Sequence, residues 1–511
     1  MFDGIKSLLH IGPTKPVTPP PPPPLPVAEP PAPAAPPAMP PGQFSGPLSP
    51  GTDPNPDAGA ARAKADGIWL ASATPHDAGT KDSRTIDKAG GLPDVHDGLK
   101  DAQAVQQLFA NRELEQKAYA KLSPEDRARY DHVEATVDND PQAHLALQVM
   151  LLENKLAAGP KSRVGDQTVL QGLDKMATQP GMQNISKNRI LGETLREIAQ
   201  PNCINQAGKE TCSVTVLQQM TARDNPAEYV RIMGGLSAAN PEDVKLAGNN
   251  ATIKRLPANE SDDRSGRTMT SQLWQSSFMQ LAAGLTHGTY DVAKDVTINP
   301  NGSKEAGMTA QKMLVVAQDL TGKDWNGNSS FIFQTHMFAE INQAITKVPP
   351  QPITVTLATG KFDAHGTKAG EDASVQVLSA KNGQVKYKDA KGTHTIPEGE
   401  FMNRLRATPN NNLDTFNDAV MSQLKTHVAS QPPGQTGVPV QLHWGNFDEK
   451  GATHWGPAVD GSHFVNVTKI ENGQVYFLNP HGHEEHMPEA DFKNRLQSAF
   501  WNENKPIPAA H

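Results

Sequence analysis

Residues 206–219 read QAGKETCSVTVLQQ, and this stretch decides the predicted fold. A polar loop runs into Cys212, and apolar residues at helical spacing follow it, so a helix is expected to begin at this cysteine. Unpaired N–H groups and the positive end of the helix dipole favour a thiolate at such a position. Gln206 lies upstream, where its side-chain amide would meet an oxyanion formed over the sulfur. The alternative interpretation is a buried structural cysteine beside a surface glutamine.

A second stretch, at residues 461–482, reads GSHFVNVTKIENGQVYFLNPHG. Its alternating apolar residues predict two strands joined by a tight turn at Asn472-Gly473. A hairpin that folds there, with some stagger or a bulge, brings His463 and Asn479 together at its open end. A histidine oriented by an amide is a candidate general base for a cysteine nucleophile.

These motifs together resemble the papain-like cysteine peptidases: a glutamine, a helix-opening cysteine, then a histidine and an asparagine in a strand pair. The segment 463–482, followed by PEADFKNRL at 488–496, is most similar to the bacteriocin-processing (double-glycine) peptidases and their soluble bacterial relatives. Those relatives typically carry aspartate where this chain has Asn479, and many have glycine or tryptophan in place of Ser213. The resemblance implies an α+β papain-like domain with a helical half that carries the cysteine and an antiparallel β half that carries the histidine and asparagine.

The resemblance also implies peptide-bond hydrolysis through an acyl-enzyme thioester, with a protein or peptide substrate and no cofactor. Cys212 is then the nucleophile, and His463 is the general base and acid that Asn479 orients. Gln206 and the backbone N–H of Cys212 would stabilise the oxyanion. Transglutaminases and glutamine deamidases use the same triad and remain an alternative. A catalytically inactive papain-like binding module is the non-enzymatic alternative.

Composition excludes several classes of protein. The 511 residues are enough for two or three domains, and a net charge of −8 argues against nucleic-acid binding. No apolar run approaches the ~20 residues of a membrane span. The first residues do not form a secretory signal, so we expect a cytoplasmic protein or one secreted without a cleavable signal peptide. The two cysteines, Cys203 and Cys212, indicate a thiol protein, with a disulfide between them as a minor alternative.

Shifts in composition predict the domain organisation. The unbroken proline run at 19–24 belongs to a Pro/Ala-rich stretch that cannot form a core and would bind a groove-type partner or secretion machinery. The turn-rich sequence DWNGNS at 324–329 predicts a loop. The predicted divisions are a disordered leader or linker (1–62), a helical accessory domain (63–200), a papain-like catalytic domain (201–500) with duplicated β-hairpin units at 352–407 and 439–498, and a tail (501–511).

The duplicated units share a strand, a hairpin with an NGQV turn and a helix ending in NRL. When the turns are aligned, Ala373 in the first unit takes the place of His463. Asp389 takes the place of Asn479. The first unit therefore lacks the base and is predicted to be a scaffold or a substrate-facing wall.

Other residues are weaker candidates. Trp444 and Trp455 precede the histidine and are predicted to wall the substrate cleft, with an aromatic core as the alternative. The run HGHEEH at 481–486 does not have the spacing of a helical zinc motif, so no metal site is expected there. His443 and His454 are alternative bases, but neither has an amide at hairpin distance.

Overall fold

The computed structural model describes residues 76–77, 101–241, 243–347, 351–358, 361–362, 368–369, 372–431, 437–443 and 462–506. Helices make up 47% and strands 25% of these residues, which agrees with the predicted α+β class. The expected leader at 1–62 lies outside the described residues. Within the described part of the chain, no helix is long and apolar enough to cross a membrane.

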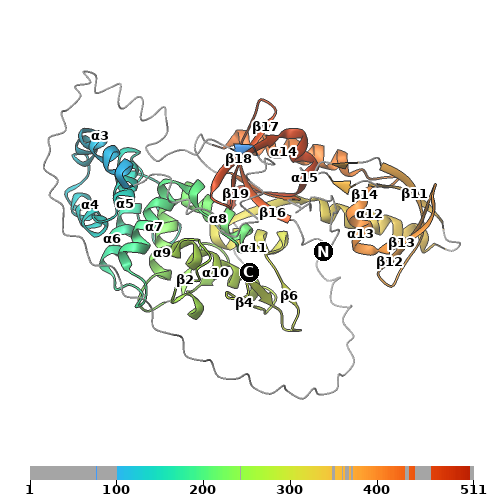
Figure 1. Cartoon of the computed structure of the whole chain (residues 1–511), viewed down its shortest axis with the longest axis horizontal. Coiled ribbons are helices and arrows are strands. Elements are labelled where there is room, and N and C mark those ends of the chain that lie inside the picture. Colours follow the sequence, from blue (N-terminus) through green and yellow to red (C-terminus); the bar gives the residue numbers. More distant parts are fainter. Residues whose placement is uncertain are drawn as a thin grey trace, which may run out of the picture. The chain divides into compact units, whose positions relative to one another are not determined.

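Helices predominate in residues 101–321 (Figure 1). Ser123 and Asp140 cap α4 (Pro124–Val137) and α5 (Pro141–Leu152), each with a proline at the first helical position. The other helices of this part are α3 (Asp101–Tyr119), α6 (Val169–Thr178), α7 (Lys187–Ala199), α8 (Cys212–Asp224), α9 (Pro226–Leu236), α10 (Met269–Gly284) and α11 (Ala310–Thr321).

One hydrophobic core joins these helices and crosses the predicted boundary at residue 200. Trp274 of α10 is fully buried and packs on Tyr229 and Phe278, with ring centroids 4.9 and 4.6 Å away. Phe464 and Phe500, from the strands near the C-terminus, belong to the same core. The large buried aromatic area holds the helices against the β part. The domain boundary itself stays a prediction.

The strands form two main sheets. The first contains β8 (Ile353–Ala358), β11 (Asp372–Lys381), β12 (Gln384–Asp389), β13 (Gly392–Pro397) and β14 (Leu405–Ala407). The second contains β1 (His76–Asp77), β7 (Lys323–Ser329), β15 (Val438–His443), β16 (Ser462–Glu471), β17 (Gln474–Asn479), β18 (His483–Pro488) and β19 (Leu496–Pro506). Short strands elsewhere are β2 (Val244–Lys245), β3 (Thr252–Ile253), β4 (Thr289–Asp291), β5 (Val296–Ile298), β6 (Lys304–Glu305), β9 (Lys361–Phe362) and β10 (Lys368–Ala369).

The two main sheets contain the same structural unit. The order β13-β12-β11-β8-β14 in one corresponds to β18-β17-β16-β15-β19 in the other. Both hairpins turn at an Asn-Gly pair with positive φ, at Asn382 and Asn472. Both carry a bulge at the same point, after Val377 and after Val467. A short helix precedes the last strand of each unit, α13 (Glu398–Arg404) and α15 (Glu489–Arg495).

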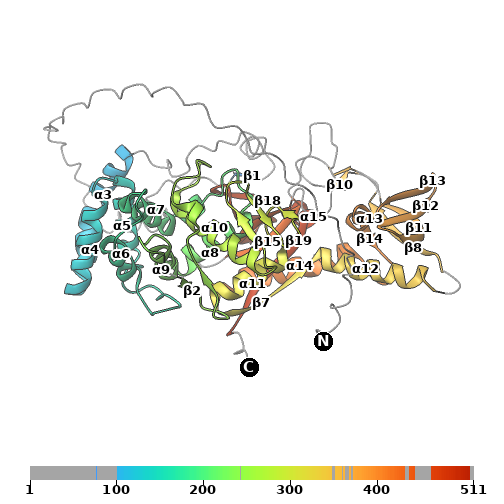
Figure 2. The same ribbon diagram turned by 90° about the horizontal axis from the view of Figure 1, so that it is seen from below.

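A longer helix precedes each unit, α12 (Ser330–Ile345) and α14 (Leu413–Ser430), and these two helices contact each other (Figure 2). Phe333 of α12 stacks on Phe416 of α14, with centroids 4.3 Å apart and rings within 11° of parallel. Ser330 Oγ donates to Asn417 Oδ1 at 3.1 Å. Equivalent helices thus join the two units.

Two segments differ from their sequence-based predictions. DWNGNS at 324–329 is strand, not loop, because it pairs antiparallel with β19. Gly327 permits this pairing, since a Cβ there would lie 2.4 Å from Phe500 Cδ1. The predicted tail at 501–511 begins inside β19, where Trp501 is buried and pairs with Asn326.

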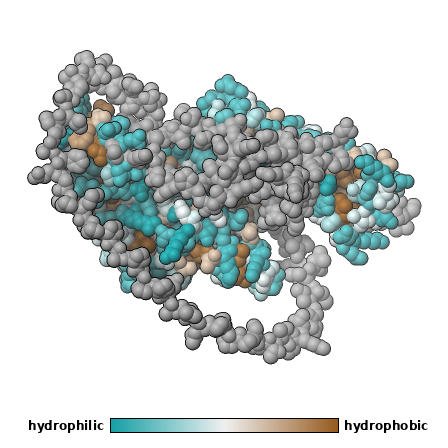
Figure 3. Space-filling model, in the orientation of Figure 1, coloured by the Kyte–Doolittle hydropathy of each residue, from teal (hydrophilic) through white to brown (hydrophobic). Residues whose placement is uncertain are grey.

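The visible face of the described residues is mainly hydrophilic, with small hydrophobic spots (Figure 3). Four large apolar side chains of the described chain are exposed, and they are Val105, Phe109, Leu285 and Leu378. Apart from the Val105 and Phe109 pair on α3, they lie far apart in the sequence. Scattered exposed apolar residues are ordinary on protein surfaces.

Candidate active site

Cys212 is the first residue of α8, as its sequence position predicts. Thr211 does not cap the helix with its side chain, because its hydroxyl donates to Gln275 Oε1 at 2.9 Å. Backbone hydrogen bonds from Ser213 and from Cys212 itself reach the thiol instead and lower its pKa. Cys203 and Cys212 are both free thiols, so the alternative disulfide does not form.

Burial outweighs these hydrogen bonds. Cys212 is 8% exposed, and burial raises the pKa of its thiol to about 12. The charge of Glu210 raises this pKa as well, whereas a backbone hydrogen bond from Phe464 lowers it. Burial of the thiol disfavours its ionised form by more than the about 0.3–1 kcal/mol by which a helix dipole typically favours it. Burial therefore opposes the thiolate that the position at the helix start favours.

The thiol lies against the strand that carries His463. The backbone N–H of Phe464, the next residue on β16, hydrogen-bonds to the sulfur. Helix α8 packs on β16 and β17, and Gln219 Nε2 donates to the carbonyl oxygen of Asn479 at 3.2 Å. The structure therefore brings the predicted nucleophile, Cys212, to the hairpin that carries the predicted base.

His463 and Asn479 form a buried pair across this hairpin. Their side chains are 6% and 1% exposed, and His463 Nε2 lies 2.9 Å from Asn479 Oδ1. The orientation of the amide follows from its other contacts, because Nδ2 donates to Glu485 Oε1 at 2.7 Å and Oδ1 accepts from the His481 N–H at 3.1 Å. An amide oxygen only accepts, so His463 Nε2 carries the proton and the neutral ring has its basic lone pair on Nδ1.

The turn after β17 is bound to the loop that precedes α8. The ring of His481 stacks on that of His463, with centroids 5.1 Å apart and planes 11° apart. The backbone of His481 pairs with Asn205. The N–H of Gln206 donates to the carbonyl of Pro480 at 2.7 Å. These contacts hold the nucleophile loop and the hairpin together.

Gln206 is buried within the nucleophile loop, at 5% exposure. Its Nε2 donates to the carbonyl oxygen of Lys209 at 2.6 Å, and its Oε1 has no partner among the described atoms. One amide hydrogen thus binds the loop, and the second remains for another acceptor. The predicted contribution of Gln206 to an oxyanion site stays a prediction.

The remaining candidates are only partly described. Trp444 and Trp455, the predicted walls of the cleft, lie outside the described residues, as does His454. The backbone of His443 pairs with Ser462 between β15 and β16.

Sequence reasoning missed Glu485. This residue is fully buried on β18, where its Oε1 accepts from Asn479 Nδ2 and from His483 Nε2, the latter at 2.6 Å. The spacing of HGHEEH at 481–486 draws attention to a metal site, whereas the alternation of its residues is the signal that indicates Glu485. Alternate residues of β18 are buried, and these inward positions lie beside the end of β17.

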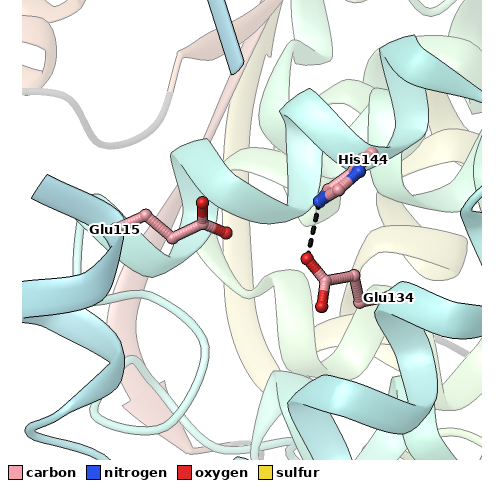
Figure 4. A group of neighbouring side chains, drawn as sticks. All are labelled: Glu115, Glu134 and His144. Carbon is pink, nitrogen blue, oxygen red and sulfur yellow. Dashed lines mark hydrogen bonds and ion pairs between the residues drawn. The ribbon is translucent and has the colours of Figure 1, made fainter. Parts of the chain in front are cut away.

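One group of side chains in the described residues has the composition of a metal site (Figure 4). Glu115, Glu134 and His144 come from α3, α4 and α5, and their candidate ligand atoms lie within 4.8 Å of one another. His144 Nε2 is 2.7 Å from Glu134 Oε1, while Glu115 accepts from Tyr130 Oη at 2.6 Å and Gln148 Nε2 at 2.8 Å. All three side chains thus make hydrogen bonds that connect α3, α4 and α5, and these bonds explain the cluster without a metal ion.

A buried polar network lies behind the start of α8. Gln218 Nε2 donates to Glu197 Oε2, and Gln275 Nε2 donates to Gln218 Oε1, both at 3.1 Å. Through Gln275 the network reaches Thr211, the residue before the cysteine. Burial raises the pKa of Glu197 to about 7, although hydrogen bonds from neighbouring hydroxyls lower it.

The arrangement combines a buried thiol, an imidazole whose amide contact favours a basic lone pair on Nδ1, and N–H donors at a helix start. These groups are the ones that nucleophilic attack on a carbonyl and stabilisation of the resulting oxyanion require. A search for relatives among protein-family models, curated proteins and solved structures found no match to the chain.

Proposed function

We propose that the protein is a cysteine peptidase of the papain-like type, which cleaves peptide bonds through a thioester at Cys212. The observation that carries this proposal is the buried hydrogen bond between His463 Nε2 and Asn479 Oδ1, on the strand pair against which the thiol lies. In the tautomer that this amide contact favours, Nδ1 is the basic nitrogen of the ring, as a general base requires.

The first half-reaction transfers the acyl group to sulfur. His463 Nδ1 takes the thiol proton as Cys212 Sγ bonds to the carbonyl carbon, because burial raises the pKa of the thiol and opposes its ionisation before the attack. The N–H of Cys212 and the second amide hydrogen of Gln206 stabilise the oxyanion. The C–N bond then breaks, and the imidazolium returns the proton to the leaving amine.

The second half-reaction releases the acyl group. His463 takes a proton from water as the water oxygen attacks the thioester carbonyl. The C–S bond breaks, and the sulfur receives the proton back from the imidazolium. Asn479 holds the ring in one tautomer during both steps, so that the same nitrogen exchanges the proton each time.

Covalent labelling with a peptidyl electrophile tests the proposal. We expect stoichiometric labelling at Cys212, its loss in Cys212→Ala, and its retention in the matched control Cys203→Ala, since the proposal gives Cys203 no catalytic role. Labelling at Cys203 alone, or equal labelling of both cysteines, contradicts the proposal. A folded Cys212→Ala variant that keeps hydrolytic activity also contradicts it.

Mass spectrometry of a treated protein library separates hydrolysis from related acyl transfers. New chain termini are the expected result. The mass change of deamidated glutamine, or crosslinks between glutamine and lysine, would identify the acceptor chemistry of a deamidase or a transglutaminase instead. No labelling of the folded protein by any peptidyl electrophile would support an inactive binding module.

A further inference from the structure

The amide of Asn479 makes three hydrogen bonds, and only one of them involves the proposed base. Its oxygen accepts from His463 Nε2 at 2.9 Å and from the N–H of His481 at 3.1 Å. Its nitrogen donates to Glu485 Oε1 at 2.7 Å. Glu485 is fully buried, and its Oε1 also accepts from His483 Nε2 at 2.6 Å.

An asparagine amide can rotate by half a turn with little change in shape, and the rotation would exchange its donor and acceptor ends. The rotated amide of Asn479 would place Nδ2 against the N–H of His481 and Oδ1 against the carboxylate of Glu485. Both contacts would be repulsive. Two donors would meet at one end and two acceptors at the other, in a buried site where an unsatisfied polar group costs about 1–3 kcal/mol.

The orientation of this amide decides the tautomer of the imidazole. With the oxygen toward His463, Nε2 carries the proton and Nδ1 has the lone pair. With the nitrogen toward His463, Nε2 would have to accept, and the proton would move to Nδ1, where no proton can be taken from a thiol.

The first β unit provides an internal comparison. Asp389 and His394 occupy the positions that Asn479 and Glu485 occupy in the second unit, and Asp389 Oδ1 lies 2.9 Å from His394 Nε2. The contact between these two positions is therefore a property of the unit. Both oxygens of the Asp389 carboxylate accept hydrogen bonds, so a carboxylate at this position can accept from a histidine in either orientation. The Asn479 amide has one accepting and one donating atom, so it needs Glu485 as an acceptor to fix its orientation.

We propose that Glu485 is a positioning residue of the active site: its buried carboxylate fixes the Asn479 amide and thereby keeps His463 in the tautomer whose Nδ1 is the base. His483 supports the carboxylate from the other side. The expected effect on rate rests on the proposed function. The expected tautomer of His463 does not, and it can be measured separately.

The test combines ¹⁵N NMR of the imidazole nitrogens with the rate of Cys212 alkylation by iodoacetamide, both in a Cys203→Ala background of the full chain. The His463 signals are assigned by their loss in His463→Ala. In the parent protein we expect the Nε2–H tautomer. In Glu485→Gln we expect a mixture of tautomers and a rate lower by about 10- to 100-fold, by analogy with the carboxylates that orient metal-binding histidines. The neighbouring Glu484→Gln, which does not contact Asn479, is the matched control and should match the parent.

A double substitution separates orientation from mere packing. Asn479→Asp alone puts two carboxylates in contact in a buried site, so we expect a slower rate. In Asn479→Asp/Glu485→Gln, the new amide can donate to the new carboxylate. That carboxylate accepts from His463 in either orientation, so we expect the Nε2–H tautomer and most of the rate to return. If Glu485→Gln does not fold, the double variant is compared with Asn479→Asp, and the same order of rates is expected.

The proposal is overturned if Glu485→Gln keeps the Nε2–H tautomer together with the parent rate, or if the double variant is no better than Asn479→Asp. An alkylation rate at Cys212 that does not fall in His463→Ala, with the tautomers of the parent protein as expected, would instead remove the proposed peptidase function. In that case the positioning of His463 by Glu485 still stands.

Discussion

The two β units share a strand order, a turn and a bulge, yet they differ in what covers one face of each sheet. In the second unit, Phe464 and Leu478 are buried, and Phe464 belongs to the core of the helical part. The equivalent residues of the first unit, Ser374 and Lys388, are exposed. The unit by itself is therefore a scaffold, and contact with α8 is what brings a cysteine to one copy.

The largest expected effect comes from copying a residue of the first unit into the second. His463→Ala introduces the residue found at Ala373. We expect the acylation rate of Cys212 to fall by roughly 10⁴- to 10⁶-fold, because a buried thiol with a pKa of about 12 loses the base that accepts its proton. Burst kinetics with an activated ester measure this rate.

The reverse substitution, Ala373→His, is the control. The new histidine would lie in the first unit, which contains no cysteine. We therefore expect the acylation rate of the parent protein and no additional activity. A rate in His463→Ala within about tenfold of the parent would mean that His463 is not the base.

A smaller effect is expected from exchanging the residues on the covered face. Phe464→Ser should lower the free energy of unfolding by about 3–5 kcal/mol, because it removes a buried ring from the core shared with the helices. Ser374→Phe should change it by no more than about 0.5 kcal/mol, because that position is exposed. Urea titrations of both variants at one pH provide the comparison, and equal losses would show that α8 does not stabilise the second unit.

Local sequence signals predicted the features that depend on one or two residues. The Asn-Gly pairs fold the hairpins with positive φ at Asn382 and Asn472, and the start of α8 at Cys212 follows from the apolar spacing after it. The pairing of His463 with Asn479 could be predicted because a hairpin fixes the separation of its two strands.

Features that depend on distant packing could not be predicted in this way. The dipole argument favoured a thiolate at Cys212, but burial by residues far along the chain raises the pKa of the thiol. The strand β7 looked like a loop because its partner, β19, lies more than 160 residues away in the sequence. Glu485 acquires its function only through the register of β18 on β17, which sets Asn479 opposite His483.

Next in expected size is a pH effect on stability at Glu197, which lies behind α8. Burial raises the pKa of Glu197 from 4.5 to about 7. Between these values the folded protein holds a proton that the unfolded chain has released, so stability falls as the pH rises. From pH 5 to pH 8 the loss should be about 2–3 kcal/mol, and Glu197→Gln should remove it.

Urea titrations at pH 5 and pH 8 give the change in the free energy of unfolding for the parent and for Glu197→Gln. The difference between these two changes isolates Glu197, because other titrating groups contribute equally to both. The parent should lose more stability than Glu197→Gln between pH 5 and pH 8. Equal losses would mean that Glu197 is ionised in the folded protein throughout this range. The first unit offers the contrast, because a hydrogen bond from His394 lowers the pKa of its Asp389.

The smallest effect on stability is expected from Asp389→Asn, which is the reverse exchange of Asn479→Asp at the equivalent position of the first unit. The carboxylate accepts from His394 Nε2 and from the N–H groups of Lys391 and Gly392, and an asparagine oxygen can keep accepting from the backbone. The depressed pKa of Asp389 contributes stability that is present above about pH 4 and is lost as the pH falls through the folded-state value, so Asp389→Asn should remove this acid dependence. Melting at pH 7 and at pH 3 measures it, and the Cys212 alkylation rate should not change. A changed alkylation rate in Asp389→Asn would mean that the first unit acts on the site. If the rate is unchanged in Asp389→Asn but lower in Asn479→Asp, the chemistry belongs to the second unit alone.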